Sequence, residues 1–328
     1  MHTNDTRRRF IGRTLLAGLG LAGLAAAPMA SAADYPDKPI QLIVPYGAGG
    51  PTDALLRTLA TQASQQLGQS IVIENRPGAN GTFGAAMLAR ARDSHTIAVI
   101  PATVFREPFL AKVPYDPLKL TYIIGLTDYV FGLAVRQDAP WQSWQELAED
   151  AARRPGRISV GMAGATGTAR IVLGEIADAK QLDFNFIPYK GDSELTTDLL
   201  GGHVDAAAMT GTAVQYISSG RMRYLAMLTA ERAELFPDVP TFRDLGVEAW
   251  VDSPFGLAGP ADMPPAHVQR IHDAFKAALE SPQGRQALAS LNQPLNYMAP
   301  QAYADYARQA IEREKGRVEY LRAQGLVN

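Results

Sequence analysis

Short apolar runs alternate with amphipathic stretches along most of the chain. Ile40–Val44 is apolar at every position except Gln41, which is typical of a strand buried on both faces. The stretch from Leu55 to Leu67 carries leucines and alanines on one helical face and is followed by a glycine stop signal. Further apolar runs at Ile71–Ile73 and Thr96–Ile100 are separated by a helical pattern. This alternation predicts an α/β fold with a parallel sheet flanked by helices.

The same pattern begins again past the middle of the chain. Ile158–Gly161 indicates a strand, the loop Met162–Thr168 contains glycine and threonine, and Ala169–Ala179 has a helical pattern. Three more segments rich in apolar residues predict further strands, at Phe184–Ile187, Val204–Met209 and Tyr224–Leu228. The chain is therefore predicted to form two α/β units, each of which opens with a strand, a glycine-containing loop and a helix.

Two similar extended segments stand at the boundaries of the second unit. Phe131-Gly132-Leu133-Ala134 leads into it, and Phe255-Gly256-Leu257-Ala258 leaves it. A double crossover between two lobes needs two such segments, and a hinge needs only a few residues at element ends. A chance match between two apolar strands is the alternative. The hinge interpretation assigns residues 33–130 and 256–328 to lobe 1 and residues 131–255 to lobe 2.

The C-terminal part of the chain is predicted to be helical and to cover lobe 1. Its helical patterns begin at proline, a residue favoured at the first helical position. They are Pro265–Glu280, Pro282–Leu291 and Pro300 to about Ala323.

The N-terminus has the features of a cleavable export signal. Arg7-Arg8-Arg9 is followed by the apolar run Leu15–Ala27 and by the small residues Ala30-Ser31-Ala32. A membrane-spanning helix needs roughly 20 apolar residues, so an anchor helix is the disfavoured alternative. We expect a signal peptide at residues 1–32 and a mature periplasmic protein that begins near Ala33. The paired arginines are typical of the twin-arginine export route, with the Sec route as the alternative.

Composition and charge narrow the class of function. The chain is 47% apolar with a net charge of −2, which offers no field for nucleic acid or for an anionic membrane. It contains no cysteine, so disulfide and thiolate chemistry are excluded. Gly47-Ala48-Gly49-Gly50 lacks the ending of a nucleotide-binding loop, and no Gly-x-Ser-x-Gly elbow is present. His267 and His272 lie too far apart around one predicted helix to share a metal and are expected on the surface. We expect no catalytic residue, no metal and no cofactor.

Two loops combine glycines with hydroxyl side chains just before a predicted helix. They are Tyr46–Asp53 and Met162–Thr168. At the carboxyl ends of strands in an α/β sheet, such loops border the ligand-binding crevice. Glycines let a ligand approach the backbone, and the unpaired amides and dipole of a helix N-terminus favour an anion. The alternative is structural, with Thr52 and Thr168 capping their helices and the glycines making tight turns. Two matched loops favour a carboxylate held between the lobes.

A series of short motifs runs in a fixed order along the chain. They are Tyr35-Pro36-Asp37-Lys38-Pro39-Ile40, the Pro45–Asp53 loop, Glu74-Asn75-Arg76-Pro77-Gly78-Ala79, Pro188-Tyr189-Lys190-Gly191, Leu199–Asp205 and Phe236–Thr241. This series resembles the Bug (Bordetella uptake gene) proteins, the periplasmic receptors of tripartite tricarboxylate transporters. The resemblance implies a two-lobed, type II periplasmic binding protein, a venus flytrap that closes over an organic carboxylate. It also implies delivery to the membrane subunits of a transporter, without catalysis or cofactor. We expect a monomer.

The resemblance places the ligand between the loop after the first strand and the loop that opens the second lobe. The implied ligand-binding residues are Tyr46, Gly47, Ala48, Gly49, Thr52, Asp53, Thr103, Gly164, Thr166, Gly167, Thr168, Tyr189 and Thr210. Asp53 matches an acidic residue of the family. It either accepts a ligand ammonium or hydroxyl group or favours the helix N-terminus.

Three residues depart from the family pattern. Met162 and Arg170 replace a serine and a histidine, and Arg106 stands where a neutral polar residue is expected. If it faces the cleft, Arg106 or Arg170 holds a second carboxylate through a bidentate guanidinium contact. Arg170 is therefore added to the predicted ligand-binding residues. For each arginine, pairing with a surface acid is the alternative. Two other functions stay open, a periplasmic sensor for a two-component system and an enzyme on the same scaffold.

Overall fold

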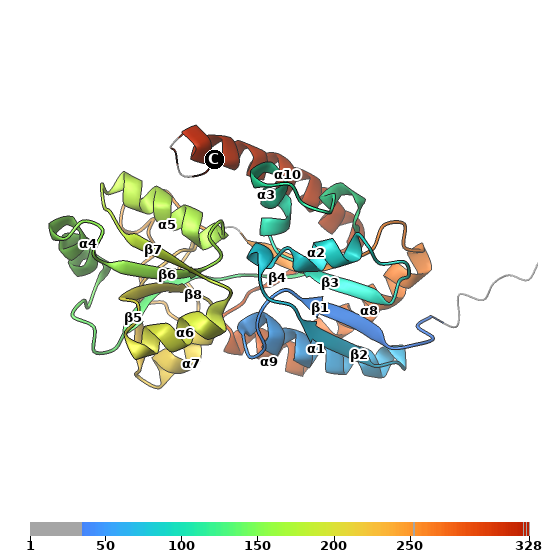
Figure 1. The fold of residues 1–328 in the computed structure, drawn as a ribbon. Helices are drawn as coiled ribbons and strands as arrows, with labels where there is room; N and C mark the ends of the chain where they lie inside the picture. Colours follow the sequence, from blue (N-terminus) through green and yellow to red (C-terminus); the bar gives the residue numbers. More distant parts are fainter. Residues whose placement is uncertain (1–34, 252, 324, 326, 328) are drawn as a thin grey trace, which may run out of the picture. The chain divides into compact units, whose positions relative to one another are not determined.

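Two β-sheets with helices packed on them make up the part of the chain that the structure describes (Figure 1). The computed structural model describes residues 35–328 apart from 252, 324, 326 and 328. The predicted signal peptide at residues 1–32 lies outside the described residues.

The first sheet contains the predicted strands of the N-terminal unit. Its order is β11-β4-β10-β3-β1-β2. The bounds are β1 (Ile40–Val44), β2 (Ile71–Asn75), β3 (Thr96–Ile100), β4 (Thr121–Asp128), β10 (Pro254–Gly259) and β11 (Leu295–Met298). β1 runs parallel to β2 and β3, with Leu42 opposite Ile73 and Ile97. β10 is antiparallel to β3 and β4, and β11 is antiparallel to β4.

The second sheet is built from the middle of the chain, in the order β7-β6-β8-β5-β9. The bounds are β5 (Gly132–Arg136), β6 (Ser159–Ala163), β7 (Asn185–Tyr189), β8 (Ala206–Met209) and β9 (Met222–Met227). β6 is parallel to β7 and β8, whereas β5 is antiparallel to β8 and β9. The predicted restart of the strand, loop and helix pattern near residue 158 is confirmed by β6 and the helix after it.

Both sheets are mixed, although the sequence pattern predicted parallel sheets. The chain passes from β4 of the first sheet directly into β5 of the second, and it returns from β9 to β10 through residues 228–253. A parallel neighbour needs a long crossover connection, usually a helix, on its own sheet. β5 and β10 instead enter from the opposite sheet, and each is antiparallel to the strands beside it.

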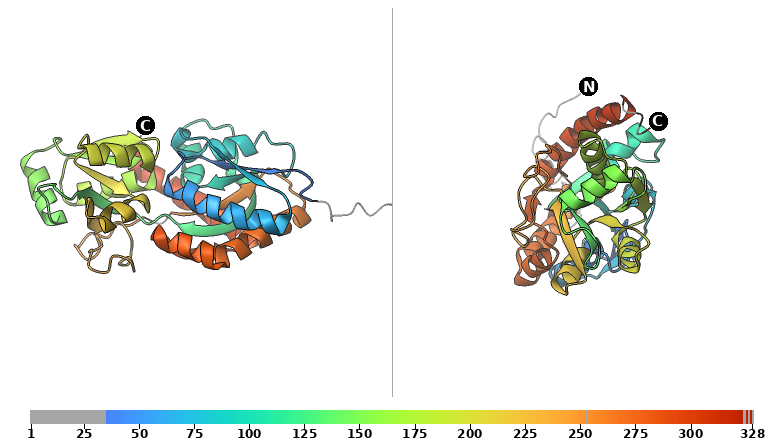
Figure 2. Two further views of the ribbon diagram at one scale, coloured as in Figure 1. Left: turned by 90° about the horizontal axis from the view of Figure 1, so that it is seen from below. Right: turned by 90° about the vertical axis from the view of Figure 1, so that its left-hand side faces the viewer.

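Helices pack on the faces of both sheets. With the first sheet lie α1 (Pro51–Leu67), α2 (Phe83–Leu88), α3 (Thr103–Leu110), α8 (Pro265–Glu280), α9 (Pro282–Ser290) and α10 (Pro300–Ala323). With the second lie α4 (Trp144–Arg153), α5 (Thr168–Ala179), α6 (Asp192–Gly201) and α7 (Thr212–Ser218). Short 3₁₀ turns span Ala79–Gly81 and Pro117–Lys119. α1 packs against α8 and α9, while α10 packs against α3 and β4 (Figures 1 and 2). The predicted C-terminal helices are confirmed, and α9 ends one residue early.

The two crossings between the sheets lie close together. The ring of Tyr129 stacks on that of Phe255 at 4.3 Å between centroids and lies 6.1 Å from that of Phe131. All three side chains belong to one core cluster that includes residues of both sheets. The lobe boundaries at residues 131 and 255, and a hinge between them, stay predictions.

Candidate ligand-binding site

A pocket of about 280 Å³ is lined by loops of both sheets. These loops follow the carboxyl ends of β1, β3, β6 and β7, where an open α/β sheet holds its ligand. Tyr129 and Phe131 of the first crossing and Ser253 of the second complete the wall. The pocket therefore lies where the two sheet units and both crossings meet.

Four helices begin at the pocket wall. They are α1, α3, α5 and α6, and their N-cap residues Gly50, Ala102, Gly167 and Gly191 all line the pocket. None of these N-caps makes a side-chain hydrogen bond to its helix. The amides of the first turns therefore lack capping side chains, and four positive helix ends meet at one small cavity, which favours an anion.

The threonines of the two predicted loops do not cap their helices, which removes the structural alternative for them. Thr52 and Thr168 lie inside α1 and α5, after the N-cap. Thr52 instead shares a hydrogen bond of 2.9 Å with the hydroxyl of Tyr129. The buried hydroxyl of Thr103, also on the pocket wall, has no hydrogen-bond partner among the described residues. An unpaired buried hydroxyl is costly, so it suits a site that a ligand fills.

Asp53 shapes the first loop and does not line the pocket. It accepts hydrogen bonds from the amide of Gly49 and from Nε of Arg57, each at 2.9 Å, and from Nδ2 of Asn75 at 2.9 Å. Although burial opposes ionisation, these donors hold the pKa of Asp53 below its usual value. Gly49 lies at φ +78°, a conformation that suits glycine. Asp53 thus fixes the loop in which Tyr46 and Gly47 face the pocket.

The second loop needs its glycines for backbone geometry. Gly164 lies at φ +77°. A Cβ atom added to Gly167 would stand 2.2 Å from the carbonyl oxygen of Ala163, which no side chain can satisfy without moving the backbone. Gly164 and Gly167 both line the pocket, as does Thr168. The loop therefore places backbone, rather than long side chains, against a ligand.

Arg106 does not line the pocket, and it does not pair with a surface acid. Its side chain on α3 is fully buried, and Nε donates to Oε2 of Glu314 on α10 at 2.6 Å. Its other nitrogens donate to the carbonyl oxygen of Thr166 and, at 3.2 Å, to Oγ1 of Thr168. Both alternatives for Arg106 are wrong, because its acid partner is buried on the C-terminal helix. The guanidinium joins α3 and α10 of the first sheet unit to the α5 loop of the second.

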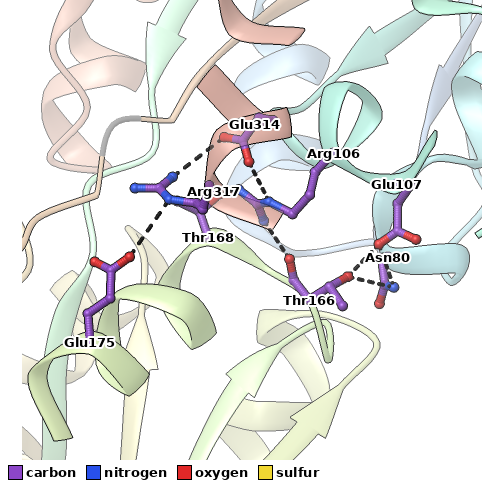
Figure 3. Close-up of polar contacts among 8 residues, drawn as sticks. All are labelled: Asn80, Arg106, Glu107, Thr166, Thr168, Glu175, Glu314 and Arg317. Atoms are coloured by element: carbon purple, nitrogen blue, oxygen red, sulfur yellow. Dashed lines mark hydrogen bonds and ion pairs between the residues drawn. The ribbon is translucent and has the colours of Figure 1, made fainter. Parts of the chain in front are cut away.

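Thr166 belongs to this junction rather than to the pocket. Its hydroxyl accepts a hydrogen bond from Nδ2 of Asn80 at 3.0 Å and donates to Glu107, which also accepts from Asn80 (Figure 3). At the other end of the junction, Arg317 of α10 lies 3.5 Å from Glu314 and 3.9 Å from Glu175 of α5. A polar network therefore runs across one side of the boundary between the two sheet units. We name the set Arg106, Glu107, Thr166, Thr168, Glu314 and Arg317 the junction network.

Arg170, His267 and His272 take positions that the sequence did not predict. The guanidinium of Arg170 lies over the ring of Phe186 at 4.0 Å and does not line the pocket. His272 is 6% exposed and bonds to the hydroxyl of Tyr297 at 2.9 Å, so its predicted surface position is wrong. His267 is half-buried and stacks on Tyr35 at 3.8 Å. Packing against aromatic rings accounts for all three side chains.

The pocket brings together many of the predicted site residues. Those on its wall are Tyr46, Gly47, Thr52, Thr103, Gly164, Gly167, Thr168, Tyr189 and Thr210. Those outside it are Ala48, Gly49, Asp53, Thr166 and Arg170. Sequence reasoning missed Asn80, Tyr129, Asp192 and Ser193, which also line it. A signal existed for Asp192 and Ser193, because they follow the Pro188–Gly191 motif directly and open a helix.

Tyrosine hydroxyls and one acid supply the main polar side chains of the wall. Tyr46 and Tyr129 meet edge to face at 6.2 Å, and burial raises the pKa of each hydroxyl, so both stay neutral donors. Asp192 is the only acidic residue among the described residues that line the pocket. The pocket can thus bind an anion through backbone and hydroxyl groups, with one carboxylate set apart on its wall.

Among the described residues, no group of three or more His, Cys, Asp or Glu side chains is placed to hold a metal ion. Nor does any described helix combine the length and the apolar character that crossing a membrane requires.

Comparisons with known proteins agree with this fold. The family model for the tripartite tricarboxylate transporter family receptor (TctC) matches residues 55–322. A "UPF0065 protein in gbd 5'region" of Cupriavidus necator is 41% identical over 319 residues, 96% of this chain and 98% of that protein. The structure of periplasmic binding protein BugD has a TM-score of 0.83 and 29% identity, covering 89% of this chain and 99% of that one. MatC from Rhodopseudomonas palustris with bound malate has a TM-score of 0.79 and 27% identity, covering 87% and 100%.

The fold is that of a two-lobed periplasmic binding protein. The chain belongs to the tripartite tricarboxylate transporter receptor family, and the resemblance to the Bug proteins is confirmed. This family and fold are those of solute-binding proteins rather than of enzymes.

Proposed function

We propose that this chain is an exported periplasmic receptor that captures a small organic carboxylate and delivers it to the membrane subunits of a transporter. The convergence of four uncapped helix N-termini on one pocket carries the proposal, because their amides bind a carboxylate without a cationic side chain. The unpartnered hydroxyl of Thr103 adds a donor at the same wall. The malate held by the related MatC supports this class of ligand.

Binding is proposed to be coupled to closure of the two lobes. Loops of both sheets line the pocket, so one ligand contacts both units. A ligand shifts the equilibrium between open and closed forms only by contacts that differ between them. The segments at Phe131 and Phe255 are the proposed hinges, because the chain crosses between the sheets there. The closed form then offers a combined surface of both lobes to the transporter.

A thermal-shift screen tests the ligand class. Mature protein is unfolded and refolded to remove bound solute, then screened with mono-, di- and tricarboxylates, aromatic acids and amino acids. A ligand at 100 times its Kd is expected to raise the free energy of unfolding by about 2.7 kcal/mol. In chains of 150–250 residues, each kcal/mol typically raises Tm by about 2–4 °C. A clear rise with one class supports the receptor. Unchanged melting with every compound, for protein shown to be folded, contradicts it.

Delivery is tested in a strain that lacks the gene. We expect this strain to lose uptake of the identified carboxylate while genes induced by that compound still respond. Normal uptake with lost induction would instead assign the protein to sensing.

Export is tested on the N-terminus of the secreted protein. Intact mass is expected to show a chain that begins near Ala33, because signal peptidase cuts after small residues. The double replacement Arg8→Lys and Arg9→Lys keeps the positive charge but removes the arginines that the twin-arginine route recognises. We expect precursor to accumulate in the cytoplasm. Normal processing of this variant would assign export to the Sec route.

A further inference from the structure

Asp192 places a buried carboxylate on the pocket wall. It is the first residue of α6 and is 9% exposed. Its Oδ2 accepts hydrogen bonds from the amide of Thr210 at 3.1 Å, from the hydroxyl of Thr210, and from that of Thr212 at 3.3 Å. These bonds connect the start of α6 to the turn after β8. They use only Oδ2, one of the two carboxylate oxygens of Asp192.

The second oxygen and the negative charge lack partners. Oδ1 of Asp192 accepts no hydrogen bond from the described residues, and none of them forms an ion pair with it. Lys190 is the other charged residue on the described pocket wall. Its side chain is 71% exposed, and its ammonium lies 3.9 Å from Glu194. Asp192 is therefore a buried acid whose three donors are all neutral.

A buried carboxylate without a cation is unfavourable unless it is protonated or paired. Burial raises the pKa of Asp192, against the hydrogen bonds from Thr210 and Thr212. The N-terminus of α6 offsets part of this cost. Burial is the main cause of the raised pKa values of Tyr46 and Tyr129, and the negative charge of Asp192 is a smaller cause. The acid of the second sheet unit therefore acts across the pocket on a hydroxyl of the loop after β1 and on one of the first crossing.

We propose that Oδ1 of Asp192 receives an ammonium group of the ligand, so that the substrate class is a small amino carboxylate. This inference rests on the proposed function, because the helix amides bind the carboxylate while Asp192 makes the second, oppositely charged contact. An ammonium group supplies both a counter-charge and hydrogen-bond donors. A simple dicarboxylate would bring a second negative charge to an acid that already lacks a partner.

Ligand pairs that differ only by the amino group test this inference. Suitable pairs are aspartate with succinate, glutamate with glutarate, and alanine with propionate, measured by titration calorimetry on refolded protein. The native chain is expected to bind the amino member of one pair at least about 10-fold more tightly. Asp192→Asn, which keeps an acceptor for Thr210 and Thr212, is expected to weaken that ligand about 10- to 100-fold. Binding of the partner without the amino group is expected to stay unchanged or to become tighter, because the variant removes the unpaired negative charge of Asp192.

Glu194→Gln is the matched control. It removes the same charge from the same turn of α6, but Glu194 is 55% exposed on its side chain and does not line the pocket. Its affinities are expected to stay within about 2-fold of the native chain. Equal binding within every pair, or an unchanged amino-ligand affinity in Asp192→Asn, overturns this inference but leaves a carboxylate receptor standing. Absence of binding by all these compounds and by the carboxylates of the wider screen contradicts the receptor itself.

The pH dependence separates an ammonium ligand from a dicarboxylate held by protonated Asp192. In the free protein the pKa of Asp192 is raised, so its protonated fraction grows as the pH falls toward that value. An ammonium ligand needs the ionised acid and lowers its pKa on binding, so affinity rises with pH and levels off above the raised pKa. The amino group itself stays charged over this range. Affinity that falls as the pH rises would assign a dicarboxylate and overturn the inference.

Discussion

Replacing Glu314 with alanine is expected to lower the free energy of unfolding by about 3–5 kcal/mol. The carboxylate of Glu314 is buried and accepts from Nε of Arg106 at 2.6 Å, and Arg106 is fully buried. The variant leaves a guanidinium in the interior without its counter-charge, which is among the largest costs that one substitution produces. Urea unfolding of the ligand-free protein, followed by circular dichroism, measures the difference.

Two further variants separate the ion pair from the rest of the junction network. Glu312 is exposed on the same helix, so Glu312→Ala is expected to change stability by less than about 0.5 kcal/mol. Arg106→Met combined with Glu314→Leu removes both charges and is expected to recover most of the lost stability. This double variant lacks the bonds to Thr166 and Thr168, so we expect it to bind ligand more weakly even though it is folded. A loss below about 1 kcal/mol in Glu314→Ala would contradict a role for the pair.

Replacing Gly47 with valine is expected to weaken ligand binding at least about 30-fold while the fold persists, in line with the cost of adding methyl groups to filled space. Gly47 lines the pocket, and its backbone lies outside the left-handed region. An added Cβ would meet nothing closer than Oγ of Ser193 at 3.8 Å. The protein alone therefore accommodates the side chain, but its methyl groups occupy the space of a ligand. Titration calorimetry with the carboxylate found by thermal shift measures the loss.

The neighbouring residue provides the control for Gly47→Val. Ala48 is exposed and does not line the pocket, so Ala48→Val should leave affinity within about 2-fold. Native affinity in Gly47→Val would show that the ligand binds elsewhere. Equal losses in both variants would indicate damage to the loop rather than a filled pocket.

The elements that the sequence predicted well are those set by local patterns. Ile40–Val44 is apolar except at Gln41, and its four apolar residues are all buried, so the burial of β1 is visible in the residue types alone. Glycines at 47, 164 and 167 marked the loops that follow β1 and β6, and all three line the pocket. A positive φ favours glycine at 164, and a close backbone contact requires it at 167.

What the sequence did not predict depends on contacts between distant residues. Arg106 and Glu314 are separated by 208 positions, so no local pattern pairs them. Asp53 looked like a ligand contact because it follows the loop, but Arg57 and Asn75 hold it away from the pocket. Tyr129 lines the pocket because it lies where the chain crosses between the sheets. The alternating sequence pattern did not predict the antiparallel strands at this crossing. Each of these outcomes was decided by tertiary packing rather than by propensity.

The four helix ends at the pocket have a practical consequence for anyone who handles this protein. Backbone amides recognise the charge and shape of a small anion, so under the proposed function acetate, citrate or phosphate from a buffer is expected to compete with the natural solute. By mass action, a competitor at ten times its own Kd makes the apparent Kd of the solute about 11-fold weaker. Protein purified in citrate is therefore expected to hold citrate in its pocket at the start of an assay. Exhaustive exchange into an amine buffer is expected to free the pocket for the solute.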